Sequence, residues 1–193
     1  MTKIISIALL LVGMSTASFA HNGDPVNKEI ASSEITWKGY KVAGNHAGTV
    51  DLTSGMLQYD EAGALIGGNF VLDMTSIACT DLEGEYKGKL EGHLKSDDFF
   101  GVETNPTAAL EITKVASRGK DGEYKVVADL TIKGKTNPVK FNVRTSNGAH
   151  IAQITVDRSE YDVRYGSGSF FEKLGDNTIY DEFEISVYLQ PAK

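Results

Sequence analysis

Most of the chain alternates apolar and polar residues, which is the pattern of half-buried antiparallel strands. Eight such runs can be counted, and Asn147-Gly148 is a strong hairpin signal between the sixth and the seventh. The apolar members of the runs are, in chain order, Ile35 and Trp37; Val50 and Leu52; Phe70, Leu72 and Met74; Leu110 and Ile112; Val126, Ala128, Leu130 and Ile132; Val139, Phe141 and Val143; Ala152, Ile154 and Val156; and Phe183, Ile185, Val187 and Leu189. Alternation alone fits a sandwich as well as a barrel, but eight strands are enough for an up-and-down barrel that holds one small ligand.

Residues 81–100 follow a different period. Leu82, Tyr86, Leu90 and Leu94 recur every four residues, which places them on one slowly drifting face of a helix. Glycines recur at 84, 88 and 92, and each costs about 1 kcal/mol in a helix interior, so this helix needs a surface to lie on. We therefore predict an all-β fold, an eight-stranded antiparallel barrel, with one helical insert between strands 3 and 4 that closes or flanks the barrel.

The first twenty residues resemble a secretory signal peptide. Lys3 gives a short positive region, residues 4–12 an apolar region, and Ser18-Phe19-Ala20 a small-x-small cleavage site. Cleavage near Ala20 predicts a periplasmic or secreted protein with one domain over residues 21–193. The polar stretch 21–31, which contains Pro25, is expected to be a loose lead-in to the first strand.

The net charge and the single cysteine disfavour several classes of function. The net charge is −7, which disfavours nucleic-acid binding, because contact with phosphates needs clustered Lys and Arg. Cys79 is the only cysteine, so an internal disulfide is excluded. We expect Cys79 to be a small buried residue rather than a nucleophile, since no neighbouring base is evident.

Several ordered motifs resemble the YceI-like family of exported, lipocalin-like, polyisoprenoid-binding proteins. They are Ile35-Thr36-Trp37, the stretch Lys41-Val42-Ala43-Gly44-Asn45-His46-Ala47-Gly48, Gly67 to Ile77, Leu90 to Phe100, Leu130 to Thr136, and Asp157-Arg158 with Tyr161 to Ser167. The resemblance covers essentially the whole chain after the signal peptide. It implies an elongated antiparallel barrel whose interior takes a long apolar tail.

That expectation gives a set of candidate ligand-binding residues. The candidates for the apolar tail are Trp37, Phe70, Leu72, Met74, Leu90, Leu94, Phe99, Phe100, Leu110, Phe141 and Phe183, and the candidate head-group contacts are His46, His93, Asp97 and Arg158. Each alone also fits ordinary packing, a turn or a structural ion pair. The expected partner is a polyisoprenoid or isoprenoid quinone, with no other cofactor and no metal. Transient membrane contact and the oligomeric state, monomer or homodimer, stay open.

Two alternatives to a lipid carrier remain. Cleavage after Ala20 would leave His21 at the N-terminus, where its amine and imidazole could chelate copper in a copper-dependent oxidoreductase. The chain has none of the G-x-S-x-G, H-E-x-x-H and C-x-x-C motifs, so no other enzyme class is favoured. The second alternative is a structural or interaction module whose barrel is filled by its own side chains.

Overall fold

The computed structural model describes residues 24–193. Residues 1–20 and His21, on which the signal-peptide and copper predictions rest, lie outside the described residues. The elements are β1 (Val26–Lys41), β2 (Gly44–Tyr59), β3 (Leu65–Cys79), α1 (Gly84–Lys95), β4 (Thr107–Ser117), β5 (Glu123–Ile132), β6 (Lys135–Ser146), β7 (Ala149–Asp157), the 3₁₀ turns η1 (Arg158–Tyr161) and η2 (Gly175–Asn177), and β8 (Ile179–Pro191).

The eight strands form a closed barrel. Each strand pairs antiparallel with the next, and β8 pairs with β1, with Ile35 opposite Val187. The tight turn between β6 and β7 is made by Asn147 and Gly148, whose φ angles of 51° and 81° fit the turn that Asn-Gly predicts. The predicted fold class, an eight-stranded antiparallel barrel with a helix between strands 3 and 4, is confirmed.

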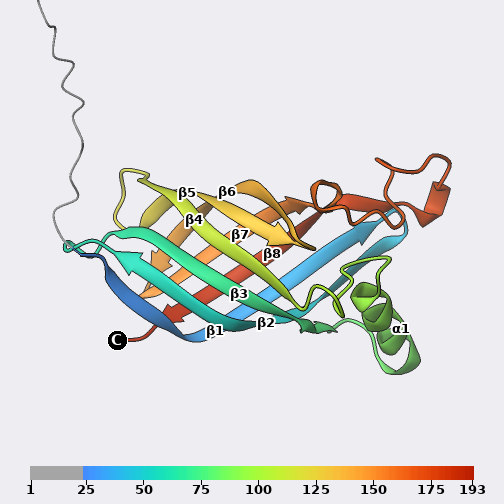
Figure 1. The fold of residues 1–193 in the computed structure, drawn as a ribbon, viewed down its shortest axis with the longest axis horizontal. Coiled ribbons are helices and arrows are strands. Elements are labelled where there is room, and N and C mark those ends of the chain that lie inside the picture. Colours follow the sequence, from blue (N-terminus) through green and yellow to red (C-terminus); the bar gives the residue numbers. More distant parts are fainter. Residues whose placement is uncertain (1–23) are drawn as a thin grey trace, which may run out of the picture.

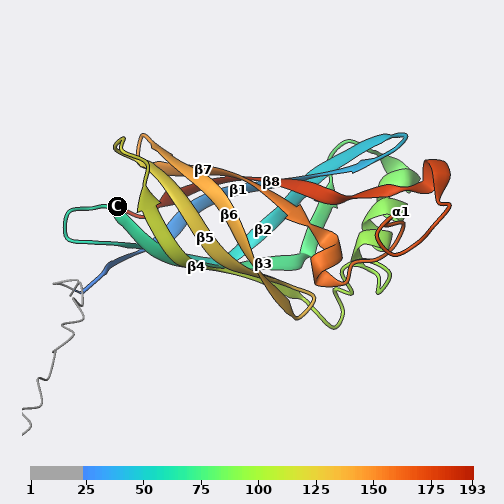
Figure 2. The same ribbon diagram turned by 90° about the horizontal axis from the view of Figure 1, so that it is seen from above.

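The barrel is elongated, with α1 at one end and the C-terminus at the other (Figure 1). Because each strand reverses the direction of the one before it, β1, β3, β5 and β7 all finish at the α1 end. The long connection from β7 to β8, residues 158–178, extends past the same end, as a quarter turn of the molecule also shows (Figure 2). Sequence-distant segments therefore meet around one opening of the barrel.

The first strand begins earlier than the sequence pattern suggested. Residues 26–31 are not a loose lead-in, because Val26 to Glu29 pair with Tyr59 to Met56 of β2. Only Val26, Ile30 and Ala31 of these six residues are apolar, and all but Lys28 and Ile30 are exposed, so the period-2 apolar signal is weak here. Their order comes from backbone pairing with β2, which a side-chain pattern does not reveal.

The helix is shorter than predicted, and only its second half packs an apolar face against the barrel. It spans Gly84–Lys95, so Leu82 precedes it, and Tyr86 is 73% exposed rather than packed. Leu94 is buried and Leu90 is half-buried, because only this half lies over the barrel opening. Gly88 and Gly92 have open space at the position of a Cβ, so the glycine face points away from the barrel. Within residues 24–193, no helix has the length and apolar character needed to cross a membrane.

Candidate functional site

The α1 end of the barrel contains a largely apolar cavity of about 160 Å³. Its wall comes from six strands, β1 to β5 and β8, from α1, from the turn that follows α1 and from the start of η1. The lining residues are Trp37, Gly39, Tyr40, Lys41, His46, Val50, Leu72, Met74, Ile77, Leu90, His93, Leu94, Phe99, Phe100, Ala108, Leu130, Ile132, Arg158, Ile179, Tyr180, Phe183 and Ile185. We call this the outer cavity.

A second cavity of about 80 Å³ lies deeper in the barrel, and we call it the inner cavity. Leu72, Leu130 and Ile185 line both cavities, so these three side chains form the boundary between them. The other residues around the inner cavity are Ile35, Leu52, Leu57, Leu65, Phe70, Ala109, Leu110, Ile112, Phe141, Val143, His150, Ala152, Ile154, Val187 and Leu189. The two cavities together make an elongated apolar interior that ends near His150.

Strand alternation places these residues inside, and one glycine shapes the wall beside Trp37. A Cβ on Gly48 would lie 2.5 Å from the Trp37 ring and 1.8 Å from the Ala78 carbonyl oxygen. Only glycine therefore lets the indole lie against β2 at this point. The Trp37 indole N–H donates to the Thr49 carbonyl at 3.2 Å, which fixes the ring in the cavity wall.

All eleven residues predicted for an apolar tail line one of the two cavities. Phe70, Leu110 and Phe141 line the inner cavity, Leu72 lines both, and the other seven line the outer cavity. The prediction favoured aromatic residues and omitted aliphatic neighbours such as Leu130, Ile132 and Ile185. The period-2 alternation of β5 and β8 points these side chains inward, so the strand pattern could have identified them.

The inner end of the interior is closed by a small hydrogen-bonded network. Nε2 of the buried His150 lies 2.7 Å from the Tyr59 hydroxyl, and its Nδ1 lies 3.1 Å from the Thr145 hydroxyl. Burial lowers the pKa of His150, and burial together with the nearby Tyr124 raises the pKa of Tyr59 to about 12. The network is therefore neutral near pH 7. Sequence reasoning missed it, because Tyr59 and His150 are far apart in the chain.

Arg158 lines the outer cavity, but its guanidinium has a structural role: it joins the connection between β7 and β8 to strand β8. It is 3% exposed and donates to the carbonyls of Val163, Tyr165, Ile179 and Tyr180 at 2.8 to 3.1 Å. Burial lowers its pKa, whereas Asp181, 3.4 Å from Nη2, acts in the opposite direction. Its acidic partner is Asp181 of β8. Arg158 lines the outer cavity, where its guanidinium lies 5.4 Å from the centroid of the Phe99 ring, but its N–H groups donate to the backbone.

The other predicted polar residues separate into two groups. His93 and His46 line the outer cavity, and His93 packs edge-on against Tyr165 and Phe99, with ring centroids 4.3 and 5.5 Å away. Asp97 is exposed and does not line either cavity, so it is poorly placed for a head-group contact. It belongs to the turn after α1, where its carbonyl and that of Phe99 each accept from the Lys133 ammonium at 3.0 Å.

His46 belongs to a cluster that the sequence did not reveal. The Asp81 carboxylate accepts from His46 Nδ1 at 2.9 Å, from the Cys79 thiol at 3.0 Å and from the Ala47 N–H at 3.1 Å. Partial burial raises the pKa of Asp81, but these three hydrogen bonds outweigh it and hold the pKa at about 2. Burial, followed by the bond to Asp81, raises the pKa of Cys79. Cys79 is buried as predicted and is not activated as a nucleophile.

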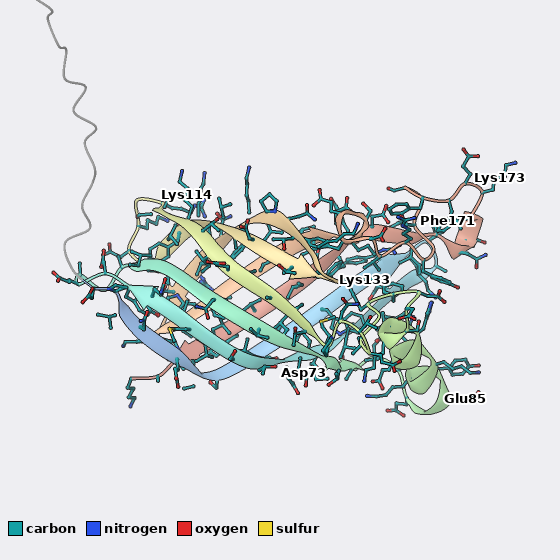
Figure 3. The ribbon with its side chains drawn as sticks, in the orientation of Figure 1. Asp73, Glu85, Lys114, Lys133, Phe171 and Lys173 are labelled. Atoms are coloured by element: carbon teal, nitrogen blue, oxygen red, sulfur yellow. The ribbon has the colours of Figure 1, made fainter. Side chains whose placement is uncertain are left out.

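The connection between β7 and β8 presents aromatic side chains to solvent. Phe170 and Phe171 are 40% and 48% exposed, and Figure 3 shows Phe171 and Lys173 beyond the end of the barrel, on the α1 side. The connection is held to the barrel through Arg158 and through Ser169, whose hydroxyl donates to Asp181 at 2.6 Å. Its tip therefore lies close to the outer opening.

These features agree with the comparison to known protein families, in which the model of the YceI-like domain matches residues 24–190. The chain belongs to the YceI-like family. A UPF0312 protein of Staphylococcus aureus is 34% identical over 86 residues, which cover 39% of this chain and 47% of that protein. A UPF0312 protein of Staphylococcus epidermidis is 31% identical over 112 residues, covering 48% of this chain and 60% of its own length. This YceI-like chain thus spans about half the length of the curated relatives it matches.

Solved structures share the barrel at low sequence identity. BcnA of Burkholderia cenocepacia superposes with a TM-score of 0.65 and 21% identity, covering 83% of this chain and 96% of BcnA. A polyisoprenoid-binding domain from Saccharophagus degradans gives a TM-score of 0.56 and 17% identity, covering 86% of this chain and 97% of that domain. At these identities the likeness concerns the fold alone.

Proposed function

We propose that this YceI-like protein binds and carries a long-chain apolar lipid, a polyisoprenoid or an isoprenoid quinone, without catalysing its conversion. One observation carries the proposal: two apolar cavities lie in line inside the barrel and share a wall at Leu72, Leu130 and Ile185. A linear apolar chain is the ligand shape that fills both cavities together. The polyisoprenoid-binding domain with the same fold supports this ligand class.

The energetics favour binding through the tail. A buried methylene-sized group contributes about 0.8 kcal/mol, so one five-carbon isoprene unit contributes about 3 to 4 kcal/mol. Association costs several kcal/mol in lost translational and rotational freedom. Burial of three or four units is therefore enough for about micromolar affinity without any head-group contact. The eleven predicted tail residues are the contacts we assign to the ligand.

The head group belongs at the outer opening. Polar side chains border the outer cavity there, whereas the inner cavity meets only the closed network around His150. We favour His93 and His46 as the head-group contacts. The N–H groups of Arg158 already donate to backbone carbonyls, and Asp97 does not line the cavity. The exposed Phe170 and Phe171 beside this opening suit brief contact with a lipid surface during loading.

Trp37 provides a direct test, because it is the only tryptophan and lines the outer cavity. Delipidated protein is titrated with an isoprenoid quinone, which quenches indole fluorescence on contact. The proposal predicts saturable quenching with a midpoint of about micromolar. The matched control is the same quinone ring without its isoprenoid tail, for which only linear collisional quenching is expected. Identical linear quenching by both compounds would contradict tail-driven binding and would favour a barrel that holds no ligand.

A further inference from the structure

We propose that His46, Cys79 and Asp81 form a binding site for a divalent transition metal ion, with zinc as the expected ion. One imidazole nitrogen, the thiol sulfur and one carboxylate oxygen all lie within 4.8 Å of one another. Among residues 24–193, these three are the one set of His, Cys, Asp or Glu side chains whose donor atoms lie close enough together to hold a metal ion. The metal site shares His46 with the proposed head-group contacts, but it does not require that the barrel binds a lipid.

The backbone holds all three residues in place. His46 is in β2 and Cys79 is the last residue of β3, and these strands pair through Gly48 and Cys79. Asp81 follows two residues later, where its carboxylate accepts from the Ala47 N–H and where the Thr80 N–H donates to the Ala47 carbonyl at 2.9 Å. Small side-chain rotations are therefore enough to bring the three donor atoms around an ion.

The distances fit such a rearrangement. Zinc binds sulfur at about 2.3 Å and nitrogen or oxygen at about 2.0 to 2.2 Å, so its tetrahedral ligands are separated by about 3.3 to 3.7 Å. His46 Nδ1 now lies 2.9 Å from Asp81 Oδ2, Cys79 Sγ lies 3.0 Å from Asp81 Oδ1, and the three donor atoms lie within 4.8 Å of one another. Each separation therefore needs to change by only about 1 Å to match tetrahedral coordination. Binding exchanges the thiol proton of Cys79 for the ion, while His46 coordinates as the neutral imidazole.

The ligand atoms and their charges indicate which class of metal ion would bind. Thiolate, imidazole and carboxylate together suit zinc and its neighbours, whereas calcium and magnesium prefer oxygen alone. The Asp81 carboxylate and a Cys79 thiolate would balance the two charges of the ion. The neighbouring Lys87 ammonium is already paired with Glu91 at 3.4 Å, so it adds no net positive charge. Three protein ligands leave one position for water or for a ligand atom in the outer cavity, which His46 lines.

Cobalt(II) is a sensitive probe of this site, because a cobalt–thiolate bond gives a charge-transfer absorption in the near ultraviolet. Cys79 is the only cysteine, so this band reports on it alone and is blind to a separate metal site at His21. The full chain, kept reduced, is titrated with cobalt and then with zinc, which should displace the cobalt and abolish the band. No lipid is present, so this result stands apart from the quinone titration.

The variants make the test specific. Cys79→Ser should abolish the band, and His46→Gln and Asp81→Asn should each weaken cobalt binding at least about tenfold. His93→Gln is the matched control, because His93 lines the same cavity outside the cluster, and it should bind cobalt like the wild type. Absence of the band in the wild type, or wild-type affinity in His46→Gln, would overturn the proposal. His46→Gln decides the matter even if Asp81→Asn fails to fold, because His46 contributes a single hydrogen bond to the cluster.

Discussion

Replacing Ala152 by phenylalanine should shorten the ligand that the barrel can hold. Ala152 in β7 lines the inner cavity, between Val143 of β6 and Val187 of β8 on the neighbouring strands. The added ring points into empty space of about 80 Å³ and would fill most of it. The outer cavity, with Trp37 and the proposed head-group contacts, is unchanged, because Ala152 is not part of its wall.

The expected loss follows from the volume that is filled. The inner cavity has half the volume of the outer one, about 80 against 160 Å³, which corresponds to about one of the three or four buried isoprene units. One unit is worth about 3 to 4 kcal/mol when fully buried. A displaced unit keeps part of its apolar contact, so we expect a loss of about 2 kcal/mol, or about thirtyfold in affinity. Short-tailed quinones, which stay in the outer cavity, should bind as they do to the wild type.

The assay is the Trp37 titration with isoprenoid quinones of increasing tail length. Ala116→Phe is the matched control, because Ala116 lies exposed on β4 and an added ring there does not enter the barrel. Thermal unfolding should show Ala152→Phe close to the wild type in stability, since the ring enters a void rather than a fully packed core. The reasoning is refuted if long-tailed quinones bind Ala152→Phe and Ala116→Phe equally well. Equal losses for short and long tails would likewise show that the ring acts on the whole barrel.

Three further predictions concern stability and dynamics. Arg158→Lys should lower the free energy of unfolding, measured by urea titration, by about 2 to 4 kcal/mol, because a lysine ammonium cannot donate to all four carbonyls. Arg164 is exposed, so the control Arg164→Lys should change this free energy by less than about 1 kcal/mol. The lowered pKa of Asp81 stabilises the fold above the unfolded value of 3.8, and this contribution is lost as the pH falls from about 4 to about 2; Asp81→Asn should flatten the stability curve in that window. Hydrogen exchange should be faster in α1 than in β5, because most of α1 is exposed; equal protection would rule out α1 as a gate for the ligand.

The sequence predicted the strands of the barrel because the strand pattern is local. Alternation in β5, from Val126 to Ile132, directly gives the side chains that face inward, and Asn147-Gly148 gives the turn between β6 and β7. The periodicity of residues 81–100 gave the presence of α1, and Leu94 does pack on the barrel. It could not show that Tyr86 is exposed to solvent, because a helical period says nothing about how far the supporting surface extends.

The parts that the sequence did not reveal depend on distant partners. Closure of the barrel requires β1 to pair with β8, and the start of β1 is ordered by β2 rather than by its own apolar residues. The partner of Arg158 is Asp181, across the connection between β7 and β8. Tyr59 and His150 likewise meet only in the folded barrel. Candidate lining residues could be identified from local patterns, whereas polar networks required the three-dimensional fold.

The most direct test of the central claim is the mass of the native protein. Protein purified from its own host is weighed by native mass spectrometry before and after extraction with organic solvent. The account predicts an added mass that the solvent removes and that fragments as an isoprenoid. Repeated preparations that show only the mass of the chain, together with failure of the delipidated protein to take up long-tailed quinones, would contradict a lipid-binding interior.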